Sequence, residues 1–252
     1  MKTFHRIEYN GHPRHVVEEG GRFRLIDGEL FGPHTMGDEI SLAGRRTLAP
    51  VQPTKIVAIG LNYKDHAAEQ HKPLPSEPLV FMKPSTAVIG PDDPIVLPAW
   101  AGRIDHEAEV GVVIGRRARN VTEADARQYV LGLTCLNDVT ARELQAKDVQ
   151  YTRAKGFDTF APIGPCVAEV DYHQPGGVGI EGWVNGERRQ HSSTRELVFP
   201  IDRLIAHVTQ FMTLLPGDII ATGTPAGIGP LKSGDRVTIK VAGVGELSNP
   251  VR

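Results

Sequence analysis

The sequence predicts an α+β protein that is mostly β, with a few short helices. Its 252 residues include 27 glycines and 19 prolines but only 6% aromatic residues, which is typical of many strands joined by tight turns. Residues 108–114 are rich in β-branched side chains and are followed by Gly115, as expected for a buried strand. The clearest amphipathic helix lies at residues 201–212, where apolar residues recur at i, i+3, i+4 and i+7.

The first part of the chain differs from the rest. Short alternating runs are separated by the hairpin-type pairs Asn10-Gly11 and Asp27-Gly28, and a proline-containing stretch follows at residues 48–53. We therefore predict a small N-terminal β domain and linker over residues 1–52, and a larger catalytic domain over residues 53–252.

Several further elements are predicted in the larger domain. Asn62 is expected to cap a short helix that ends at Glu69, and the three prolines of residues 70–78 indicate an irregular loop or lid. The pair Thr122 and Asp125 forms a variant of the capping box and opens a second short helix. Strands are expected at residues 55–60, 79–83, 131–136, 182–187, 219–222 and 237–241.

Composition also excludes some classes of function. The formal net charge is only −2, so electrostatics give no reason to expect binding to nucleic acid or to an anionic membrane. No run of eighteen apolar residues occurs, and the N-terminus lacks the apolar stretch of a signal peptide. The two cysteines, Cys135 and Cys166, have no metal-binding spacing, and we interpret them as reduced core thiols of a cytoplasmic protein.

Two acidic residues are expected to lie side by side where the strand of residues 108–114 begins. Because side chains alternate along a strand, Glu107 and Glu109 share one face, about 7 Å apart at the backbone. Like charges at that spacing repel unless a proton or a cation lies between them, and a hard divalent metal ion would satisfy them. The alternative is a pair of exposed glutamates on an edge strand.

Asp138, at the end of the strand of residues 131–136, could complete a three-carboxylate site with Glu107 and Glu109. Three carboxylates leave about three coordination positions on an octahedral ion, which suits Mg²⁺ or Mn²⁺, with Ca²⁺ as a possible substitute. The alternative for Asp138 is that its carboxylate caps a turn.

Other polar residues have a pattern that suits catalysis. His66 and Glu69 are three residues apart on one helix face, where a carboxylate could orient an imidazole base. Lys155 could stabilise an enolate oxygen, and Gly223 and Thr224, in a glycine-rich stretch that is not a P-loop, could hold a substrate carboxylate. The alternatives are a surface ion pair, a solvated lysine and a plain structural turn.

Taken together, these stretches resemble the fumarylacetoacetate hydrolase family. The motifs occur in the family's order across residues 55–252, and the first fifty residues resemble the small N-terminal module of bacterial members. The motifs are Gly60-Leu61-Asn62-Tyr63, His66-Ala67-Ala68-Glu69, Phe81-Met82-Lys83-Pro84-Ser85, His106-Glu107-Ala108-Glu109, Asn137-Asp138-Val139-Thr140-Ala141-Arg142, Ala154-Lys155-Gly156-Phe157-Asp158, and Gly217-Asp218-Ile219-Ile220-Ala221-Thr222-Gly223-Thr224-Pro225.

The resemblance implies a mixed β-sandwich or β-roll domain, a homodimer, and a small-molecule 2-oxo acid or enol diacid as substrate. It implies that Mg²⁺ or Mn²⁺ is bound by Glu107, Glu109 and Asp138. It also implies that His66 and Glu69 form a catalytic dyad on a segment that closes over the site, and that Lys155 lies close to the metal. The positions that contact substrate in relatives are Arg142, Gln145 and Thr224.

The hypothesis that follows is a metal-dependent hydrolase that cleaves a C–C bond in an acylpyruvate- or fumarylpyruvate-type substrate. His66, oriented by Glu69, would activate water, and the product enolate would be bound by the metal and Lys155. Residues 211–214 and 241–247 instead resemble an isomerase/decarboxylase branch of aromatic-compound catabolism, whereas residues 140–145 resemble acylpyruvate hydrolases. The alternatives are therefore an isomerase or decarboxylase acting on 2-hydroxyhepta-2,4-dienedioate, 5-carboxymethyl-2-hydroxymuconate or oxaloacetate-type substrates, and a non-catalytic metabolite-binding protein.

Overall fold

A large mixed sheet extends through the computed structural model, which describes residues 1–252. Its strands are β1 (Lys2–Tyr9), β2 (His12–Glu19), β3 (Arg22–Gly28), β4 (His34–Ile40), β5 (Lys55–Gly60), β6 (Leu79–Pro84), β7 (Val88–Ile89), β9 (Ala108–Ile114), β10 (Val130–Asn137), β12 (Ala161–Ala168) and β15 (Ile219–Ala221). They follow the order β4-β3-β2-β1-β12-β10-β9-β15-β5-β6, and β7 pairs with β12. Neighbours are antiparallel except in the pairs β15–β5 and β12–β7, so the predicted mostly β fold is confirmed.

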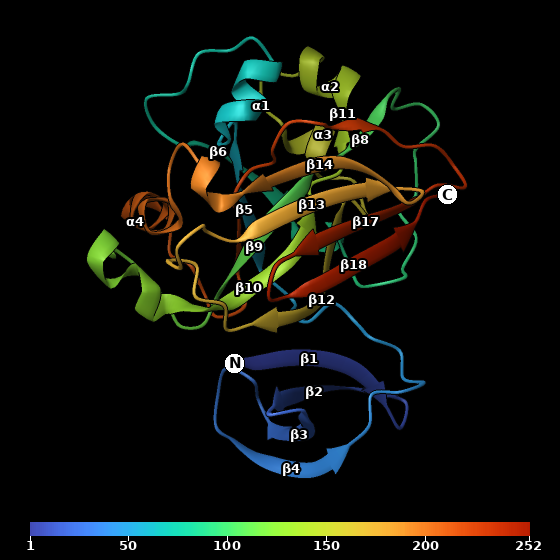
Figure 1. The fold of residues 1–252 in the computed structure, drawn as a ribbon, viewed down its shortest axis with the longest axis vertical. Helices are drawn as coiled ribbons and strands as arrows, with labels where there is room; N and C mark the ends of the chain where they lie inside the picture. The colour runs from blue at the N-terminus through green and yellow to red at the C-terminus, as the bar shows by residue number, and fades with distance from the viewer.

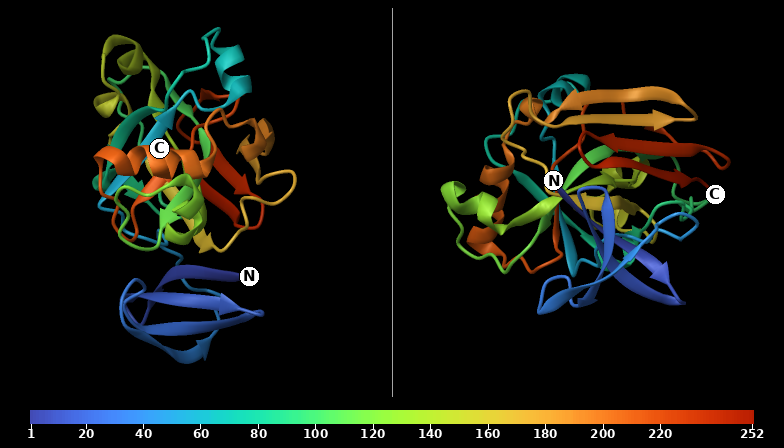
Figure 2. Two further views of the ribbon diagram at one scale, coloured as in Figure 1. Left: turned by 90° about the vertical axis from the view of Figure 1, so that its left-hand side faces the viewer. Right: turned by 60° about the horizontal axis from the view of Figure 1, so that its bottom comes forward.

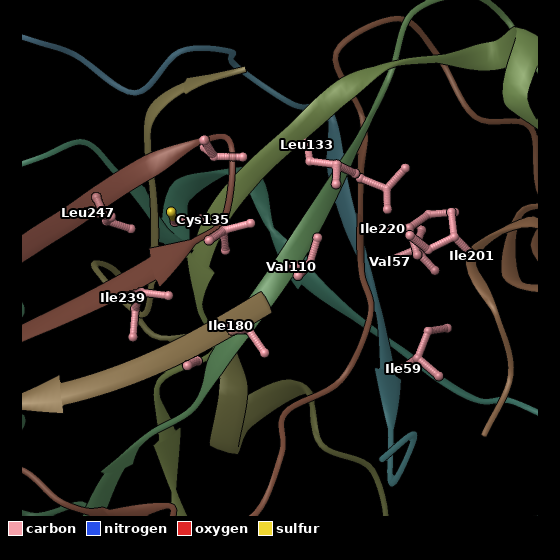
Figure 3. Packing of buried hydrophobic residues seen from close by; sticks show 14 of the residues in the cluster. Val57, Ile59, Val110, Leu133, Cys135, Ile180, Ile201, Ile220, Ile239 and Leu247 are labelled. Carbon is pink, nitrogen blue, oxygen red and sulfur yellow. The ribbon is translucent and has the colours of Figure 1, made fainter. Parts of the chain in front are cut away.

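Two smaller sheets complete the β structure. One contains β8 (Ile104–His106), β11 (Thr140–Ala141) and β16 (Gly229–Pro230), and the other contains β13 (Gly179–Val184), β14 (Glu187–Ser193), β17 (Arg236–Val241) and β18 (Gly245–Pro250). The second of these packs face to face on the large sheet. Val110 and Leu133 of the large sheet meet Ile180, Ile239 and Leu247 of the smaller one in the main hydrophobic core (Figure 3). Burial of this apolar face is the main force that holds the layers together.

Helices are short and few, as predicted. They are α1 (Lys64–Glu69), α2 (Arg142–Lys147), α3 (Thr152–Lys155) and α4 (Ile201–Phe211), with 3₁₀ turns η1 (Ser85–Ala87), η2 (Glu123–Tyr129) and η3 (Thr194–Glu196). Helices α1, α2 and α3 gather at the end of the molecule opposite β1–β4 (Figure 1). With 11 residues α4 is the longest, so none of the helices has the length and apolarity needed for a membrane crossing.

The N-terminal strands form a module at one end of the molecule (Figure 2). Asn10 and Gly11 both have positive φ (51° and 78°), which confirms the predicted hairpin turn. The module is not separated from the large sheet, because Phe4 of β1 is in register with Val167 of β12. The domain boundary between residues 52 and 53 stays a prediction, as does the homodimer.

One predicted helix cap is wrong. The N-cap residue of α1 is Tyr63, whereas the Asn62 side chain donates to Thr222 O (2.8 Å) and accepts from Phe199 N (2.9 Å). Asn62 therefore joins three chain segments instead of capping a helix. The cap at Thr122 is confirmed, since its hydroxyl accepts from the Asp125 N–H, although the helix is 3₁₀. Residues 70–78 contain no helix or strand, as expected, and their closure over a site stays a prediction.

Candidate active site

A cavity of about 140 Å³ lies where α1, α2 and α3 gather around the end of β9. That volume suits a small organic acid. The predicted site residues that line it are His66, Glu107, Glu109, Asp138, Arg142, Gln145, Lys155 and Thr224. The two remaining predicted residues, Glu69 and Gly223, are hydrogen-bonded to His66 and Glu109. The structure therefore brings all ten together.

Three buried carboxylates form the centre of the site. Glu107, Glu109 and Asp138 each offer an oxygen, and these oxygens lie within 4.8 Å of one another. Their placement follows from the sheet: β9 lies between β10 and β15, and the Asp138 N–H donates to Glu107 O (2.9 Å) where β10 ends. The glutamates are therefore not exposed residues of an edge strand. The Asp138 carboxylate accepts from two lysines and caps no turn.

Positive side chains surround the carboxylates. Lys155 Nζ donates to Glu107 Oε2 (2.7 Å) and Asp138 Oδ2 (2.6 Å), and it is buried, which excludes the solvated alternative. Arg142 Nη2 lies 2.5 Å from Glu107 Oε1, and its Nε donates to Asp105 Oδ2 (2.9 Å). Each cation therefore bridges two carboxylates, which fixes the geometry of the cluster.

Sequence reasoning missed Lys83, although it stands in a motif of the resemblance. Lys83 is fully buried in β6, donates to Asp138 Oδ1 and also bonds Val139 O (3.2 Å). A lysine inside an otherwise apolar strand is the available signal, because a buried ammonium group requires a partner. It is paired with the carboxylate that Lys155 also contacts.

The two glutamates have different electrostatic environments. Burial alone would raise the pKa of Glu107, but the charges of Lys155 and Arg142 outweigh it and hold this pKa well below its ordinary value. Burial raises the pKa of Glu109 well above its ordinary value, and the charges of Asp138 and Glu107 add to the effect. Glu109 is therefore the carboxyl group that holds a proton most readily when no cation is bound.

His66 and Glu69 form the predicted pair. His66 Nδ1 lies 3.0 Å from Glu69 Oε2, and Glu69 Oε1 accepts from the Gly227 N–H (2.9 Å). The imidazole is buried and lines the cavity, whereas the Glu69 side chain is one-third exposed. The pair is therefore not simply a surface ion pair, since its histidine faces the carboxylate cluster. A carboxylate on Nδ1 favours the tautomer that leaves Nε2 free to accept a proton.

The glycine-rich stretch borders the same cavity. Gly223 adopts φ +102° and donates its N–H to Glu109 Oε2 (2.8 Å), and a Cβ there would lie 2.9 Å from Asn62 Cβ. Glycine is therefore required by both the backbone conformation and the close approach. Thr224 accepts from Gln190 Nε2 (2.8 Å), while Gln145 accepts from Arg142 Nη1 (2.9 Å).

The donor set fits a divalent cation. Three clustered carboxylate oxygens are the ligands that Mg²⁺, Mn²⁺ and Ca²⁺ prefer. Burial raises the pKa of Glu109, and the charges of Asp138 and Glu107 add to the effect, so a bound cation would favour the charged form of this carboxylate. Lys155 already neutralises part of the negative charge of the three carboxylates, because it donates to both Glu107 and Asp138.

Comparison with known proteins gives a family match and several similar sequences. Residues 55–252 match the model of the family described as fumarylacetoacetate (FAA) hydrolase C-terminal. An uncharacterised protein of Archaeoglobus fulgidus is 54% identical over 224 residues, which cover 89% of this chain and 88% of that protein. The mitochondrial oxaloacetate tautomerase fahd2 of Xenopus laevis is 43% identical over 215 residues, which cover 81% of this chain and 67% of the tautomerase.

Solved structures of named enzymes are also similar to this chain over nearly its whole length. The 2-hydroxyhepta-2,4-diene-1,7-dioate isomerase of Mycobacterium marinum is 38% identical, with a TM-score of 0.91, covering 100% of this chain and 98% of that chain. Maleylpyruvate hydrolase of Sphingobium sp. SYK-6, solved with manganese(II) and pyruvate, is 31% identical, with a TM-score of 0.81 and coverage of 99% and 98%. The named relatives thus include an isomerase, a hydrolase and a tautomerase. With a family match over residues 55–252, the chain belongs to the fumarylacetoacetate hydrolase family.

Proposed function

We propose that this protein is a divalent-metal-dependent enzyme that hydrolyses a C–C bond in a 2-oxo acid or 1,3-dicarbonyl substrate of acylpyruvate or fumarylpyruvate type. One observation carries the proposal: the His66–Glu69 pair opens onto the same small cavity as the three-carboxylate cluster. A positioned base that faces a cation site is the arrangement that general-base hydrolysis requires.

Glu107, Glu109 and Asp138 would hold the Mg²⁺ or Mn²⁺ ion. A divalent cation held there would act as a Lewis acid that polarises the oxygen atoms of the substrate. The manganese complex of maleylpyruvate hydrolase supports this choice of ion. Arg142 and the polar groups of Gln145 and Thr224 are the proposed contacts to the substrate, because they line the same cavity.

The proposed chemistry begins at His66. With Nδ1–H donated to Glu69, the free Nε2 accepts a proton from water, and the hydroxide adds to the distal carbonyl carbon. The C–C bond then breaks, its electron pair remains on the 2-oxo acid fragment as an enolate, and the proton returns from His66 to carbon. Lys155 carries a positive charge at the cavity wall, where it would stabilise the developing negative charge.

The relatives favour a second candidate, proton transfer without cleavage. The named isomerase and tautomerase are 38% and 43% identical to this chain, whereas the named hydrolase is 31% identical. If no water is positioned, the same His66 base would move a proton between carbon and oxygen of an enolisable diacid. Loss of CO₂ from an oxaloacetate-type substrate would need the same enolate stabilisation by Lys155.

An assay on metal-stripped protein, with and without added Mg²⁺ or Mn²⁺, tests the proposal. The panel contains acetylpyruvate, fumarylpyruvate, oxaloacetate and a 2-hydroxymuconate-type diacid, with products followed by NMR. Pyruvate and a second acid that form only with metal are the expected result. A tautomer or shifted double bond without cleavage supports the second candidate. His66→Ala should abolish turnover and retain metal binding, and unchanged hydrolysis by this variant would remove the dyad from the mechanism.

A further inference from the structure

The cations of the cavity wall differ in how they are paired. Arg142 and Lys155 each contact two carboxylates within 3 Å, and their charges are therefore already compensated. Lys72 also lines the cavity, but it makes no ion pair and is exposed. It is thus the one cation of the wall whose charge is available to a ligand.

Lys72 lies just beyond the helix that carries the base, and its backbone is anchored there. His71 adopts φ 51° at the end of α1, and the Lys72 N–H donates to Ala67 O (3.0 Å), which closes the helix in the manner of a Schellman motif. His66 and Glu69 belong to the same helix. The start of the Lys72 side chain is therefore held in a fixed relation to the His66–Glu69 pair, at the edge of the otherwise irregular segment 70–78.

The charges of the wall balance one another without a metal ion. The three carboxylates match the three cations Lys72, Arg142 and Lys155. Among the groups paired with the wall, the charges of Lys83 and Arg103 equal those of Asp105 and Glu69. A bound divalent cation therefore leaves a surplus of two positive charges. A substrate with two carboxylates neutralises that surplus, whereas a monocarboxylate leaves one positive charge, that of Lys72, without a partner.

We infer that Lys72 binds the distal carboxylate of the substrate and makes this enzyme selective for 2-oxo diacids over 2-oxo monoacids. The inference rests on the proposed function, from which it takes the divalent cation and the 2-oxo acid. The 2-oxo acid end lies at the carboxylate cluster, and the far carboxylate reaches Lys72 at the mouth of the cavity. Part of the cavity wall is apolar, formed by Leu61, Leu79 and Phe81, and it suits the carbon chain.

Binding of two unreactive acids of equal length tests the inference directly. 2-Oxoglutarate and 2-oxopentanoate both have five carbons, but only the first has a distal carboxylate. In the presence of Mg²⁺, calorimetry should show that wild-type protein binds 2-oxoglutarate about tenfold more tightly. Lys72→Met should abolish this preference and leave 2-oxopentanoate binding unchanged, while Lys72→Arg should retain the preference. Turnover gives a second readout. Lys72→Met should raise KM for fumarylpyruvate about tenfold and leave kcat unchanged. KM for acetylpyruvate, which has no distal carboxylate, should not change.

Lys64→Met is the matched control, because Lys64 is an exposed lysine at the start of α1, the helix that precedes Lys72, and it does not line the cavity. It should keep the wild-type preference. A preference that survives Lys72→Met, or a wild-type protein that binds both acids equally, overturns the inference alone. Failure of both acids to bind a protein that turns over the substrate panel with metal also overturns the inference alone. Absence of metal-dependent turnover of every acid in that panel overturns the proposed function, and the inference with it.

Discussion

Glu107 and Glu109 are two residues apart on one face of the chain, yet their surroundings differ. Glu107 accepts from Lys155 and lies against Arg142, whereas Glu109 accepts only the Gly223 N–H. The same substitution should therefore have different consequences at the two positions. The difference arises from their partners, since both side chains are almost completely buried.

Glu109→Gln should lower the affinity for Mg²⁺ by about 100-fold or more, because it removes a ligand charge, and should barely change the stability of the metal-free protein. The reason is that burial and two neighbouring carboxylates raise the pKa of Glu109, so glutamine resembles its protonated form. Glu107→Gln should lower the free energy of unfolding by about 1–3 kcal/mol, because Lys155 and Arg142 each lose a charged partner. Calorimetric titration with Mg²⁺ and thermal unfolding measure the two effects. Equal destabilisation by both variants would contradict the assigned environments.

The acidic residues of the site were predictable, as were Lys155 and Arg142, but the third basic partner, Lys83, was not. Glu107, Glu109 and Asp138 stand at strand positions that alternation and strand ends reveal. Lys83 was missed because it depends on a contact between segments far apart in the chain, since it meets a carboxylate 55 residues away. No local pattern encodes such a contact.

Among the elements, the plain apolar run of β5 was predicted as a strand and the proline-containing strand β12 was not. β5 begins and ends as predicted, at Lys55 and Gly60. β12 was missed because Pro162, Gly164 and Pro165 are typical of a loop, yet this strand lies between β1 and β10 in the large sheet. Its register with β10 shifts between Leu133 and Cys135, so an irregularity in the ladder accompanies these residues.

His15, in strand β2, should make the free energy of unfolding of the protein depend on pH. Burial lowers the pKa of His15 to about 4, and the nearby charge of Arg6 adds to this. Since an unfolded histidine has a pKa of about 6.5, the unfolded chain binds the extra proton first. The contribution of His15 to the free energy of unfolding is therefore fully present above pH 6.5. It falls by about 1–3 kcal/mol as the pH decreases to 4, since the group is partly exposed.

His15→Gln should remove that part of the pH dependence. Chemical unfolding at pH 7 and at pH 4 measures it, and the variant should lose about 1–3 kcal/mol less than wild-type protein over this interval. His12→Gln is the control, because His12 is an exposed residue at the start of the same strand. Identical pH dependence in the His15 variant and the wild-type protein would show that His15 is not buried as a neutral group.

At the scale of the whole molecule, the N-terminal module shares its packing with the large sheet. Val17 and Ile26 of the module pack in one hydrophobic cluster with Ile163 and Val167 of β12. Ile7, Val16 and Leu25 form a second, smaller cluster that belongs to the module alone. The sequence predicted a separate small β unit because hairpin turns are local signals. It could not show the shared cluster, which depends on contacts across more than 130 residues of chain.

We therefore expect the module and the rest of the chain to unfold together. Ile26→Ala, in the shared cluster, should lower the free energy of unfolding of the whole molecule by about 2–5 kcal/mol and keep a single calorimetric transition. Leu25→Ala, in the cluster of the module, should shift the same single transition, because a module joined through β1–β12 pairing cannot open without exposing the edge of β12. A separate low-temperature transition in either variant, with the main transition unmoved, would show that the module unfolds independently. In that case the boundary near residue 52 would be a true domain boundary.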